Sequence, residues 1–416
     1  MKNRKLKAYI EERSKSKTAK IIVFTGARQT GKTTLSRHLF PGFTYLSIDD
    51  PVLRSRYKQL SATQWHAQFP KAILDEVQKE PSLIESVKSV YEQWADIQYI
   101  LLGSSQFLLL EKVKESLAGR CLIYDLLPLT IPEVRTDSWD DEIKDSPMQQ
   151  IVTGNLSVSD LLPSFLLDNE MAQKKKAWEH YEQFGAYPAV ADDELTDGEK
   201  QDWLKNYVRT YLERDIRDLA SFRDLEPFQK LQHYFALNTG NLINASAIGN
   251  QIGITSKTVL RYITYFEMSY QAIVLQAWSR NRNKRLVKTP KIHYLDNGVI
   301  RAVLQKQGMI TGNEFESMIV AEMYKQLKNI QAPVNMFHLR THDGKEVDFL
   351  VEFPNGYYAF EIKMADKVRE HDARHLKGLD DLLDKPLIHA FLLSNDCDTQ
   401  YIDDKTTALH VTYFLS

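Results

Sequence analysis

Residues Gly26 to Thr33 read GARQTGKT, which is the complete G-x-x-x-x-G-K-[ST] spacing of a phosphate-binding loop. Gly26 and Gly31 allow the backbone to turn amide N–H groups toward phosphate oxygens, Lys32 has the reach for the β- and γ-phosphates, and the Thr33 hydroxyl suits Mg²⁺. The alternative is an ordinary glycine turn with a surface lysine. The pattern predicts that ATP and Mg²⁺ bind at Gly26, Ala27, Arg28, Gln29, Thr30, Gly31, Lys32, Thr33 and Thr34.

Two adjacent carboxylates follow a second short apolar run, AILDEV, at Asp75 and Glu76. In a parallel sheet this strand end lies at the same edge as the phosphate loop, where ligands bind. We expect Asp75 to hold Mg²⁺ and Glu76 to orient or deprotonate the attacking water. The alternative is a helix N-terminus with acidic residues in its first turn.

A third apolar run, YILLGSS, ends in Ser104 and Ser105, and either hydroxyl could contact the γ-phosphate or the water. Arg120, in LAGR, could add positive charge to the transition state, either within one chain or from a neighbouring subunit. Ser104 and Arg120 therefore join Lys32 and Glu76 as candidate catalytic residues. An ordinary strand-ending turn and a solvated arginine are the alternatives.

A second group of charges occurs in EVDFLVEFPNGYYAFEIK, residues 346–363, which predicts a hairpin around a two-residue Asn355-Gly356 turn. Lys363 then lies opposite Asp348, and Glu361 is a diagonal neighbour of Asp348, about 7–8 Å away at the backbone. Two carboxylates at this spacing can share Mg²⁺ or Mn²⁺, and Lys363 can stabilise charge on a phosphate. The face would then be a metal-dependent phosphodiesterase site; the alternative is a solvated, salt-bridged face.

The elements that must position these residues follow from the hydrophobic pattern. From Ile21 to about Ile131, short apolar strands alternate with helical stretches, which predicts a parallel, doubly wound α/β sheet. A helical region and then a mixed α/β tail come after an acidic linker. The predicted divisions are a leader helix (1–20), a phosphate-loop domain (21–135), a helical region (136–230), a helix-turn-helix domain (231–304) and a C-terminal domain (305–416).

Basic side chains cluster in the middle of the chain. ASAIGNQIGITSKTVLRYITYFE has the form of a helix-turn-helix, with Lys257 and Arg261 early on the second helix, where groove-reading residues lie in DNA-binding proteins. The segment 278–291 holds six basic residues and no acidic one, including Arg282, Lys284 and Arg285. We expect these groups to contact DNA phosphates. Packing or subunit contact by the helices, and a solvated or internally paired loop, are the alternatives.

The composition of the chain sets limits on its function. The 416 residues carry a net charge of -2, so a nucleic-acid surface must be local, and only Cys121 and Cys397 are present, too few for a disulfide framework or a cysteine zinc site. There is no apolar run of roughly 18 residues to span a membrane and no secretory signal, so we expect a cytoplasmic protein with no membrane partner.

These motifs resemble a prokaryotic family of AAA-type P-loop ATPases, which carry a winged-helix segment and a nuclease-like tail. The resemblance rests on GARQTGKTTL, ILDEVQKEPSL, LLGSS, LAGRCLIYDLLPLT, TSKTVLRYITYF, NRNKRLVKTPKIHYLDNG and GKEVDFLVE…AFEIK, and covers most of the chain. It implies ATP binding and hydrolysis. Leu102 departs from the threonine that is commoner before the Gly-Ser.

The D-x12-E-x-K spacing of Asp348, Glu361 and Lys363 resembles the restriction-endonuclease-like PD-(D/E)xK superfamily. That resemblance implies a fourth site residue, Glu316, on the preceding helix, and Val347 departs from the proline that often precedes the aspartate. The resulting expectation is an ATPase that acts on or binds DNA and has a nuclease-like C-terminal domain; whether it is active as a nuclease, and whether the chain forms a homo-oligomer, are left open by the sequence. The alternative is a nucleotide-switched interaction protein whose winged helix and inactive tail bind protein partners.

Overall fold

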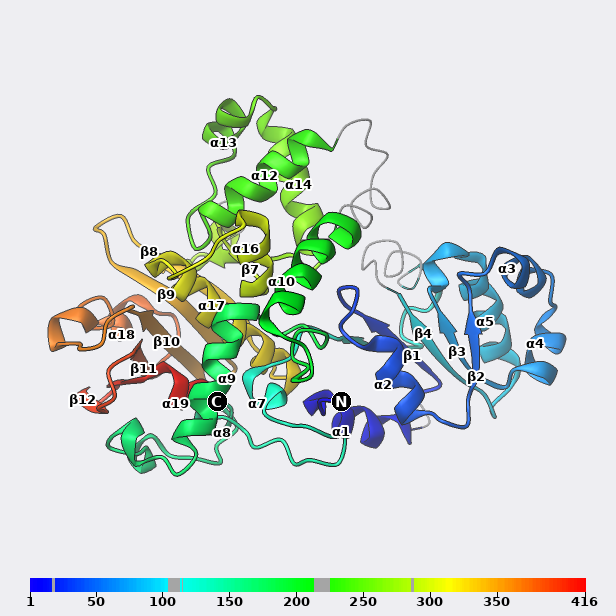
Figure 1. Cartoon of the computed structure of the whole chain (residues 1–416), viewed down its shortest axis with the longest axis horizontal. Coiled ribbons are helices and arrows are strands. Elements are labelled where there is room, and N and C mark those ends of the chain that lie inside the picture. Colours follow the sequence, from blue (N-terminus) through cyan, green and yellow to red (C-terminus); the bar gives the residue numbers. More distant parts are fainter. Residues whose placement is uncertain (17–18, 104–112, 114, 213–224, 286–287) are drawn as a thin grey trace.

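A computed structural model describes residues 1–16, 19–103, 113, 115–212, 225–285 and 288–416. The N-terminal α/β domain lies at one end of the long axis of the molecule (Figure 1). A second, larger sheet lies at the other end, and helices α12, α13 and α14 project from the side between them. The fold class predicted from the sequence, an α/β chain with a parallel phosphate-loop sheet followed by helices and a mixed sheet, is confirmed.

The N-terminal sheet is parallel throughout, with the strand order β2-β3-β4-β1-β5. Its strands are short and mostly buried, which agrees with the apolar runs of the sequence. They are β1 (Ile21–Thr25), β2 (Thr44–Ser47), β3 (Lys71–Asp75), β4 (Gln98–Leu102) and β5 (Leu122–Asp125).

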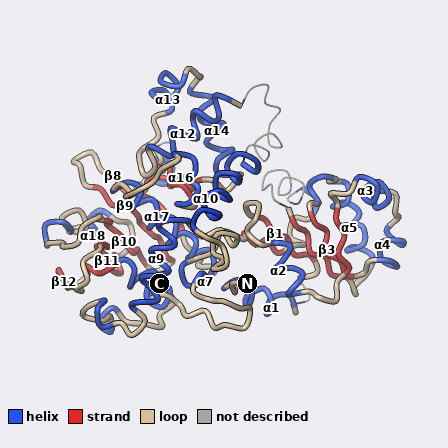
Figure 2. The backbone as a smooth tube through the Cα atoms, in the orientation of Figure 1, coloured by secondary structure: helices blue, strands red, loops and turns tan. Residues whose placement is uncertain are grey.

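Helices cover both faces of this sheet (Figure 2). Helices α1 and α2 bury apolar side chains such as Leu6, Ile10 and Leu35 on one face, and α3, α4 and α5 pack on the other. The leader helix predicted for residues 1–20 is therefore part of the domain core. The helices are α1 (Lys5–Ser14), α2 (Lys32–Leu39), α3 (Pro51–Lys58), α4 (Ala62–Gln68) and α5 (Ser82–Gln93).

The helical region joins the two sheets. Ser146 and Thr196 each start a helix with a capping box, which satisfies free amide groups at the helix N-terminus. Its helices are α7 (Ile131–Val134), α8 (Pro147–Val152), α9 (Met171–Phe184), α10 (Asp197–Asn206) and the following π-helix η4 (Tyr207–Leu212).

The middle of the chain forms a helix-turn-helix followed by a two-stranded antiparallel hairpin. Gly253 ends α13 in the left-handed conformation and the Thr255 side chain caps α14, so the predicted turn lies between the two helices. The elements are α12 (Glu226–Leu237), α13 (Ala245–Ile252), α14 (Ser256–Met268), β6 (Ala272–Ala277), α15 (Arg282–Arg285), β7 (Lys291–Tyr294) and α16 (Asn297–Leu304).

The C-terminal sheet is mixed and follows the order β12-β13-β11-β10-β9-β8-β6-β7. Helices α8, α9, α17 and α19 bury one face, while Trp278 and the α18 region cover the other. The additional elements are α17 (Gly312–Asn329), β8 (Asn335–Arg340), β9 (Glu346–Phe353), β10 (Gly356–Ile362), α18 (Leu379–Leu382), β11 (Leu387–Ser394), β12 (Gln400–Asp403), β13 (Thr406–His410) and α19 (Val411–Leu415).

The hairpin register differs from the sequence prediction. Phe353 pairs with Gly356, so the two-residue turn is Pro354-Asn355 and not Asn355-Gly356. The pairing shifts by two residues, which keeps every side chain on its predicted face because strand side chains alternate with period two. By this register Glu361 comes directly opposite Asp348 instead of diagonal to it.

The middle hairpin and the C-terminal sheet form one continuous structure. Strand β6 pairs in parallel with β8, so β6 and β7 extend the C-terminal sheet. The predicted boundary near residue 304 is therefore not a break between independently packed units. None of the helices in the described part of the chain combines the length and apolar character needed to cross a bilayer.

Candidate functional site

The phosphate loop lies between β1 and α2. Gly26 has a φ of +137°, and an added Cβ would lie 2.2 Å from the carbonyl oxygen of Leu126, so this position accepts only glycine. The Lys32 ammonium is buried and donates to the carbonyl oxygens of Gly26 (2.9 Å) and Ala27 (2.7 Å). These contacts hold the lysine over the loop, beside the N-terminus of α2, an arrangement suited to polyphosphate.

Thr33 and Asp75 meet at the carboxyl edge of the sheet. The Thr33 hydroxyl donates to Oδ2 of Asp75 at 2.7 Å, and the Tyr45 hydroxyl donates to the same oxygen at 2.7 Å. A hydroxyl and a carboxylate at this spacing are hard oxygen donors that fit Mg²⁺. Burial, the hydrogen bond to Asp75 and its charge raise the pKa of Tyr45, so the tyrosine stays a donor. Sequence reasoning missed Tyr45 because β2 carries no motif.

Glu76 follows Asp75 in the left-handed conformation, with a φ of +58°. Its backbone amide donates to Oδ1 of Asp75 at 3.0 Å, and its Oε2 accepts from Gln78 at 2.5 Å. The backbone therefore turns sharply at the strand end, and Gln78 holds the Glu76 carboxylate there. Strain of this kind in a non-glycine residue is common at functional sites.

A cavity of about 540 Å³ opens beside the phosphate loop. Gln29, Thr30, Gly31 and Thr34 form one wall, and the leader segment, Trp139 and the segment after α9 form the others. Sequence reasoning found the loop wall alone, because the remaining walls come from the leader segment and from residues about 100 or more positions beyond the loop, none of which carries a nucleotide-binding motif. The volume lies within the range of small-ligand sites and is large enough for a nucleoside.

Arg120 is a predicted catalytic residue that the structure describes, and it is not assembled with this site. Ser104 lies outside the described residues. Arg120 precedes β5, and because β5 runs parallel to β1, with Leu122 beside Ile22, Arg120 lies at the sheet edge opposite the phosphate loop. There it pairs with Glu92 at 3.3 Å. The expectation that Arg120 acts on its own nucleotide is therefore wrong, and only action on a neighbouring subunit stays a prediction.

The phosphate-loop domain is joined to the middle of the chain through Asp125. Its Oδ1 accepts from the Thr25 hydroxyl at 2.5 Å and from the Tyr270 hydroxyl at 2.6 Å. Tyr270 lies between α14 and β6, is buried, and has a φ of +57°. Thr25 directly precedes Gly26, so this bond network connects the base of the loop to the helix-turn-helix.

A second contact reaches the loop from the helical region. The Tyr207 hydroxyl donates to the carbonyl oxygen of Arg28 at 3.3 Å and lies 3.0 Å from the Tyr187 hydroxyl. Ala27 is fully buried and packs in the same apolar cluster as the middle helices. The sequence offered no signal for these partners, because isolated tyrosines follow no motif.

The C-terminal carboxylates form a second polar cluster. Lys291, on β7, pairs with Glu316 and Glu346 at 3.0 Å and with Asp348 at 3.6 Å. Lys363 pairs with Glu361 at 2.6 Å. The structure therefore brings the four predicted residues Glu316, Asp348, Glu361 and Lys363 into one region.

Burial changes the protonation of this cluster. Burial, with repulsion from Asp348, raises the pKa of Glu361 to about 8 and that of Glu316 to about 7. Burial lowers the pKa of Lys291, but attraction from Glu316, Asp348 and Glu346 outweighs that effect, and the net shift is upward. Near neutral pH, protons on Glu316 and Glu361 and the ammonium groups of Lys291 and Lys363 together offset most of the negative charge of the clustered carboxylates.

The predicted metal ligands of the C-terminal domain are engaged by other groups of the protein. Asp348 uses Oδ2 to accept the backbone amide of Ile362 at 2.9 Å, and its Oδ1 faces Lys291. Within the described ranges, no three side chains of His, Cys, Asp or Glu are grouped to hold a metal ion. The expectation that Asp348 and Glu361 share Mg²⁺ or Mn²⁺ is not supported, because ammonium groups occupy the carboxylates.

The predicted DNA-contact residues fall into two groups. Lys257, Arg261, Arg282 and Lys284 are exposed. Arg285 is buried: it pairs with Glu352 at 3.2 Å and Asp384 at 3.4 Å, and its guanidinium lies over Trp278 and Phe337. The expectation that Arg285 contacts DNA is therefore wrong, since its guanidinium is buried and engaged by carboxylates and aromatic rings.

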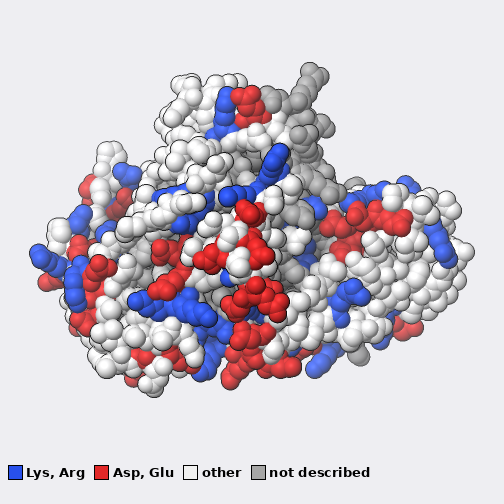
Figure 3. All heavy atoms as spheres, viewed as in Figure 1, with Lys and Arg blue, Asp and Glu red and all other residues white. Residues whose placement is uncertain are grey.

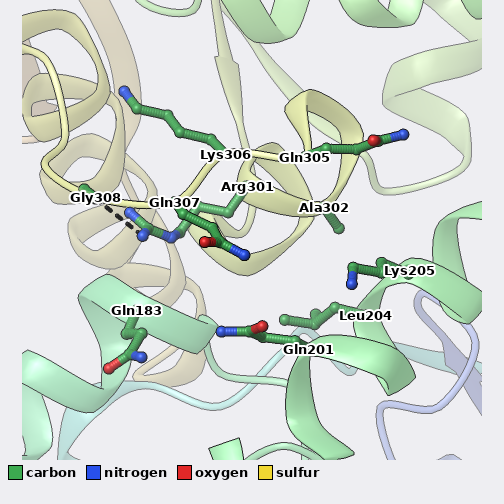
Figure 4. A pocket seen from close by; sticks show the side chains of 10 residues that line it. All are labelled: Gln183, Gln201, Leu204, Lys205, Arg301, Ala302, Gln305, Lys306, Gln307 and Gly308. Atoms are coloured by element: carbon green, nitrogen blue, oxygen red, sulfur yellow. Dashed lines mark hydrogen bonds between the residues drawn. The ribbon is translucent and has the colours of Figure 1, made fainter. Parts of the chain in front are cut away.

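The surface charge and the cavity described next indicate a function less clearly than the two sites above. On the face shown in Figure 3, patches of Lys and Arg lie next to patches of Asp and Glu. A cavity of about 230 Å³ between α9, α10 and α16 is lined by carboxamides and by Arg301, which donates to the Gly308 carbonyl oxygen at 3.0 Å (Figure 4). The carboxamides and Arg301 give this lining more polar side chains than the mostly apolar walls of typical ligand sites have.

Three family models match successive parts of the chain. Residues 18–135 match an AAA domain, residues 175–309 a domain of unknown function (DUF8612), and residues 311–414 another (DUF4143). The first match agrees with the phosphate loop, the parallel sheet and the Thr33–Asp75 contact: the N-terminal part of the chain is similar to the AAA domain of P-loop ATPases.

Relatives are distant in sequence. An uncharacterized protein of Mycobacterium tuberculosis, Rv2008c, is 24% identical over 355 residues, covering 83% of this chain and 70% of that protein. An uncharacterized protein of Methanocaldococcus jannaschii, MJ1544, is 23% identical over 386 residues, covering 87% of this chain and 79% of that protein. Among solved structures, a Walker-type ATPase of Pyrococcus abyssi, PABY2304, aligns at 14% identity and a TM-score of 0.45, covering 72% of this chain and 94% of that one.

Proposed function

We propose that this AAA-type ATPase is a nucleotide-driven switch whose middle helices bind DNA. ATP, with Mg²⁺, binds at the phosphate loop, and its hydrolysis changes the position of the helix-turn-helix and the attached C-terminal sheet relative to the ATPase domain. The observation that carries the proposal is the shared contact of Asp125 with Thr25 and Tyr270, because it joins the loop base directly to the helix-turn-helix.

The roles at the ATPase site follow from its geometry. Lys32 binds the β- and γ-phosphates, and Thr33 and Asp75 hold Mg²⁺, which neutralises phosphate charge when it is bound. Glu76 orients the attacking water at the turn after β3, and the 540 Å³ cavity takes the nucleoside. The Tyr207–Arg28 contact connects the loop to the helical region, and the Tyr270–Asp125 contact connects it to the helix-turn-helix. A change in the loop on nucleotide binding therefore moves both parts relative to the ATPase domain.

The second helix of the helix-turn-helix supports DNA as the partner. Val259, Tyr262, Ile263 and Phe266 of α14 are buried against α12 and α13. The opposite stripe is exposed at i, i+3, i+4 and i+7 and is formed by Lys257, Leu260, Arg261 and Thr264. Two cations on an exposed recognition helix, with Arg282 and Lys284 on the hairpin loop, favour phosphate contact.

DNA-stimulated ATP hydrolysis tests the proposal. We expect DNA to increase turnover in the wild-type protein, Lys32→Ala to abolish turnover, and Lys257→Glu with Arg261→Glu to remove the stimulation while basal turnover persists. The logarithm of the DNA-binding constant falls linearly with the logarithm of salt concentration. Neutralising one lysine or arginine that contacts a phosphate should make this slope shallower by about 1. Turnover indifferent to every duplex and single-stranded DNA tested would contradict DNA as the partner.

The alternative function is a nucleotide-switched protein that binds protein partners through its middle and C-terminal parts. The burial of Arg285 and Lys291 favours this alternative, because it removes two cations from the basic segment. Nuclease action by the C-terminal domain would appear as Mg²⁺- or Mn²⁺-dependent cleavage that disappears in Asp348→Ala and in Lys363→Ala. We expect the wild-type protein to show no such cleavage, given the paired carboxylates of the C-terminal cluster.

A further inference from the structure

Lys291 lies in an unusual position for a residue of a basic loop. Its side chain is buried, and its ammonium contacts three carboxylates, on α17 (Glu316) and β9 (Glu346 and Asp348). Carboxylate oxygens are also the donors that Mg²⁺ and Mn²⁺ prefer, although with Lys291 in place the described side chains are not grouped as a metal site. The cation among these carboxylates is the ammonium group of Lys291, which is part of the protein itself.

The backbone holds Lys291 in this position. Lys291 starts β7, pairs with Leu275 of β6, and forms a bridge with Leu242. Strand β6 in turn pairs with β8, which neighbours β9, the strand that carries Asp348. The lysine therefore enters the cluster from a strand of the same sheet, so the position of its ammonium is set by sheet pairing.

The remaining atoms of the cluster are mostly engaged. Asp348 Oδ2 accepts the Ile362 amide, and Glu361 Oε1 accepts Lys363. Glu361 Oε2 is buried and has no hydrogen-bond partner among the described residues. One buried carboxylate oxygen of the cluster thus stays available, and a divalent ion within its reach would gain from it.

We propose that the Lys291 ammonium is the resident cation of this cluster and excludes divalent metal ions from it. Replacing Lys291 with a neutral side chain leaves three carboxylates without their cation, and the vacated volume then binds Mn²⁺ or Mg²⁺. The C-terminal domain of the wild-type chain consequently holds its carboxylates together without metal. This inference does not depend on the DNA partner or on ATP turnover.

Mn²⁺ binding to nucleotide-free protein tests the proposal, measured by electron paramagnetic resonance and calorimetry. The variants are Lys291→Gln, the charge-conserving Lys291→Arg, and Lys288→Gln, a neutral substitution of an exposed neighbour. Asp348→Asn is measured as a single variant and in combination with each of these three substitutions. Only binding that Asp348→Asn removes is assigned to this cluster, which separates it from binding at the phosphate loop.

We expect Lys291→Gln to bind Mn²⁺ at least about tenfold more tightly than the wild type, and Asp348→Asn to abolish the gain. Lys291→Arg and Lys288→Gln should resemble the wild type. The midpoint of thermal unfolding should be lower in Lys291→Gln than in the wild type, and adding Mn²⁺ should raise it again. Any effect of Mn²⁺ on the midpoint of the wild type should be the same in Asp348→Asn.

Two outcomes would overturn the proposal. One is Asp348-dependent Mn²⁺ binding by the wild-type protein, which can be measured even if Lys291→Gln fails to fold. The other is a folded Lys291→Gln protein that gains no Asp348-dependent binding, since the cluster would then be no metal site with or without its lysine.

Discussion

The hydroxyl of Tyr270 donates to Oδ1 of Asp125 at 2.6 Å, across the boundary between the ATPase domain and the helix-turn-helix. The same oxygen accepts the hydroxyl of Thr25, the residue before the first glycine of the phosphate loop. Burial and the Asp125 charge raise the pKa of Tyr270, so the tyrosine remains a donor at physiological pH. The Asp125 carboxylate therefore gives a change in the loop one direct polar route to the middle helices.

Tyr270→Phe should uncouple the two domains. The substitution removes one hydrogen bond, worth about 1 kcal/mol of stability, and leaves the aromatic ring and the Thr25–Asp125 bond in place. We expect basal ATP turnover within about twofold of wild type and loss of stimulation by DNA, measured by phosphate release. The matched control is Tyr401→Phe, an exposed tyrosine on β12. Full stimulation in Tyr270→Phe would show that the coupling takes another route.

Asp75→Asn should lower the rate of ATP hydrolysis by about 10²–10³-fold, because it removes the negative charge that holds Mg²⁺ beside Thr33. Affinity for ATP without Mg²⁺ should be little changed, since Lys32 and the loop amides remain. Turnover and fluorescent-nucleotide binding measure the two effects separately. Glu85→Gln, an exposed carboxamide substitution on α5, is the control. Equal turnover in Asp75→Asn and Glu85→Gln would refute the assigned role.

Arg120→Ala should leave the turnover of dilute, monomeric protein unchanged, because Arg120 lies at the sheet edge opposite the phosphate loop of its own chain. If Arg120 acts on a neighbouring subunit, the wild-type rate per molecule rises with protein concentration and the variant rate does not. Turnover measured across a concentration series, alongside sedimentation, decides this. A rate defect of the variant at all concentrations would place Arg120 in its own site, against the structure.

Arg285→Ala and Arg282→Ala should separate structure from binding. Arg285→Ala leaves the carboxylates of Glu352 and Asp384 without their buried partner, which costs about 3 kcal/mol of unfolding free energy. Arg282 is exposed, so its removal should change stability by no more than about 0.5 kcal/mol while weakening DNA binding. Urea unfolding and binding titrations measure these effects. Equal stability of the two variants would contradict the burial of Arg285.

The sequence by itself was sufficient for the phosphate loop and for the position of Asp75. The eight residues from Gly26 to Thr33 prescribe their own backbone shape, since two glycines and a strand-to-helix turn suffice to aim amide groups at phosphate. Apolar periodicity then located the strands on either side, and Asp75 followed because parallel strands end at a common edge. Each of these inferences depends on neighbours within a few residues.

The hairpin was partly predictable. Alternation with period two assigned Asp348, Glu361 and Lys363 to one face, and this survived an error in the turn position. The error arose because Asn355-Gly356 is the usual turn pair, whereas Gly356 here opens β10 under close contact with the carbonyl oxygen of Pro386. Long-range packing against the segment before β11 decided the turn, so local turn preference could not.

Tertiary structure alone decided what the charged residues of the middle segment do. Arg282, Lys284, Arg285 and Lys291 are indistinguishable as basic residues of one loop, yet Arg285 and Lys291 are buried among carboxylates on β9, α17 and the segment after α18. The contacts of Asp125 with Tyr270 likewise join residues 145 positions apart. A buried charge requires a partner, but the partner is chosen by which strands pair and which helices cover them, and local sequence does not contain that choice.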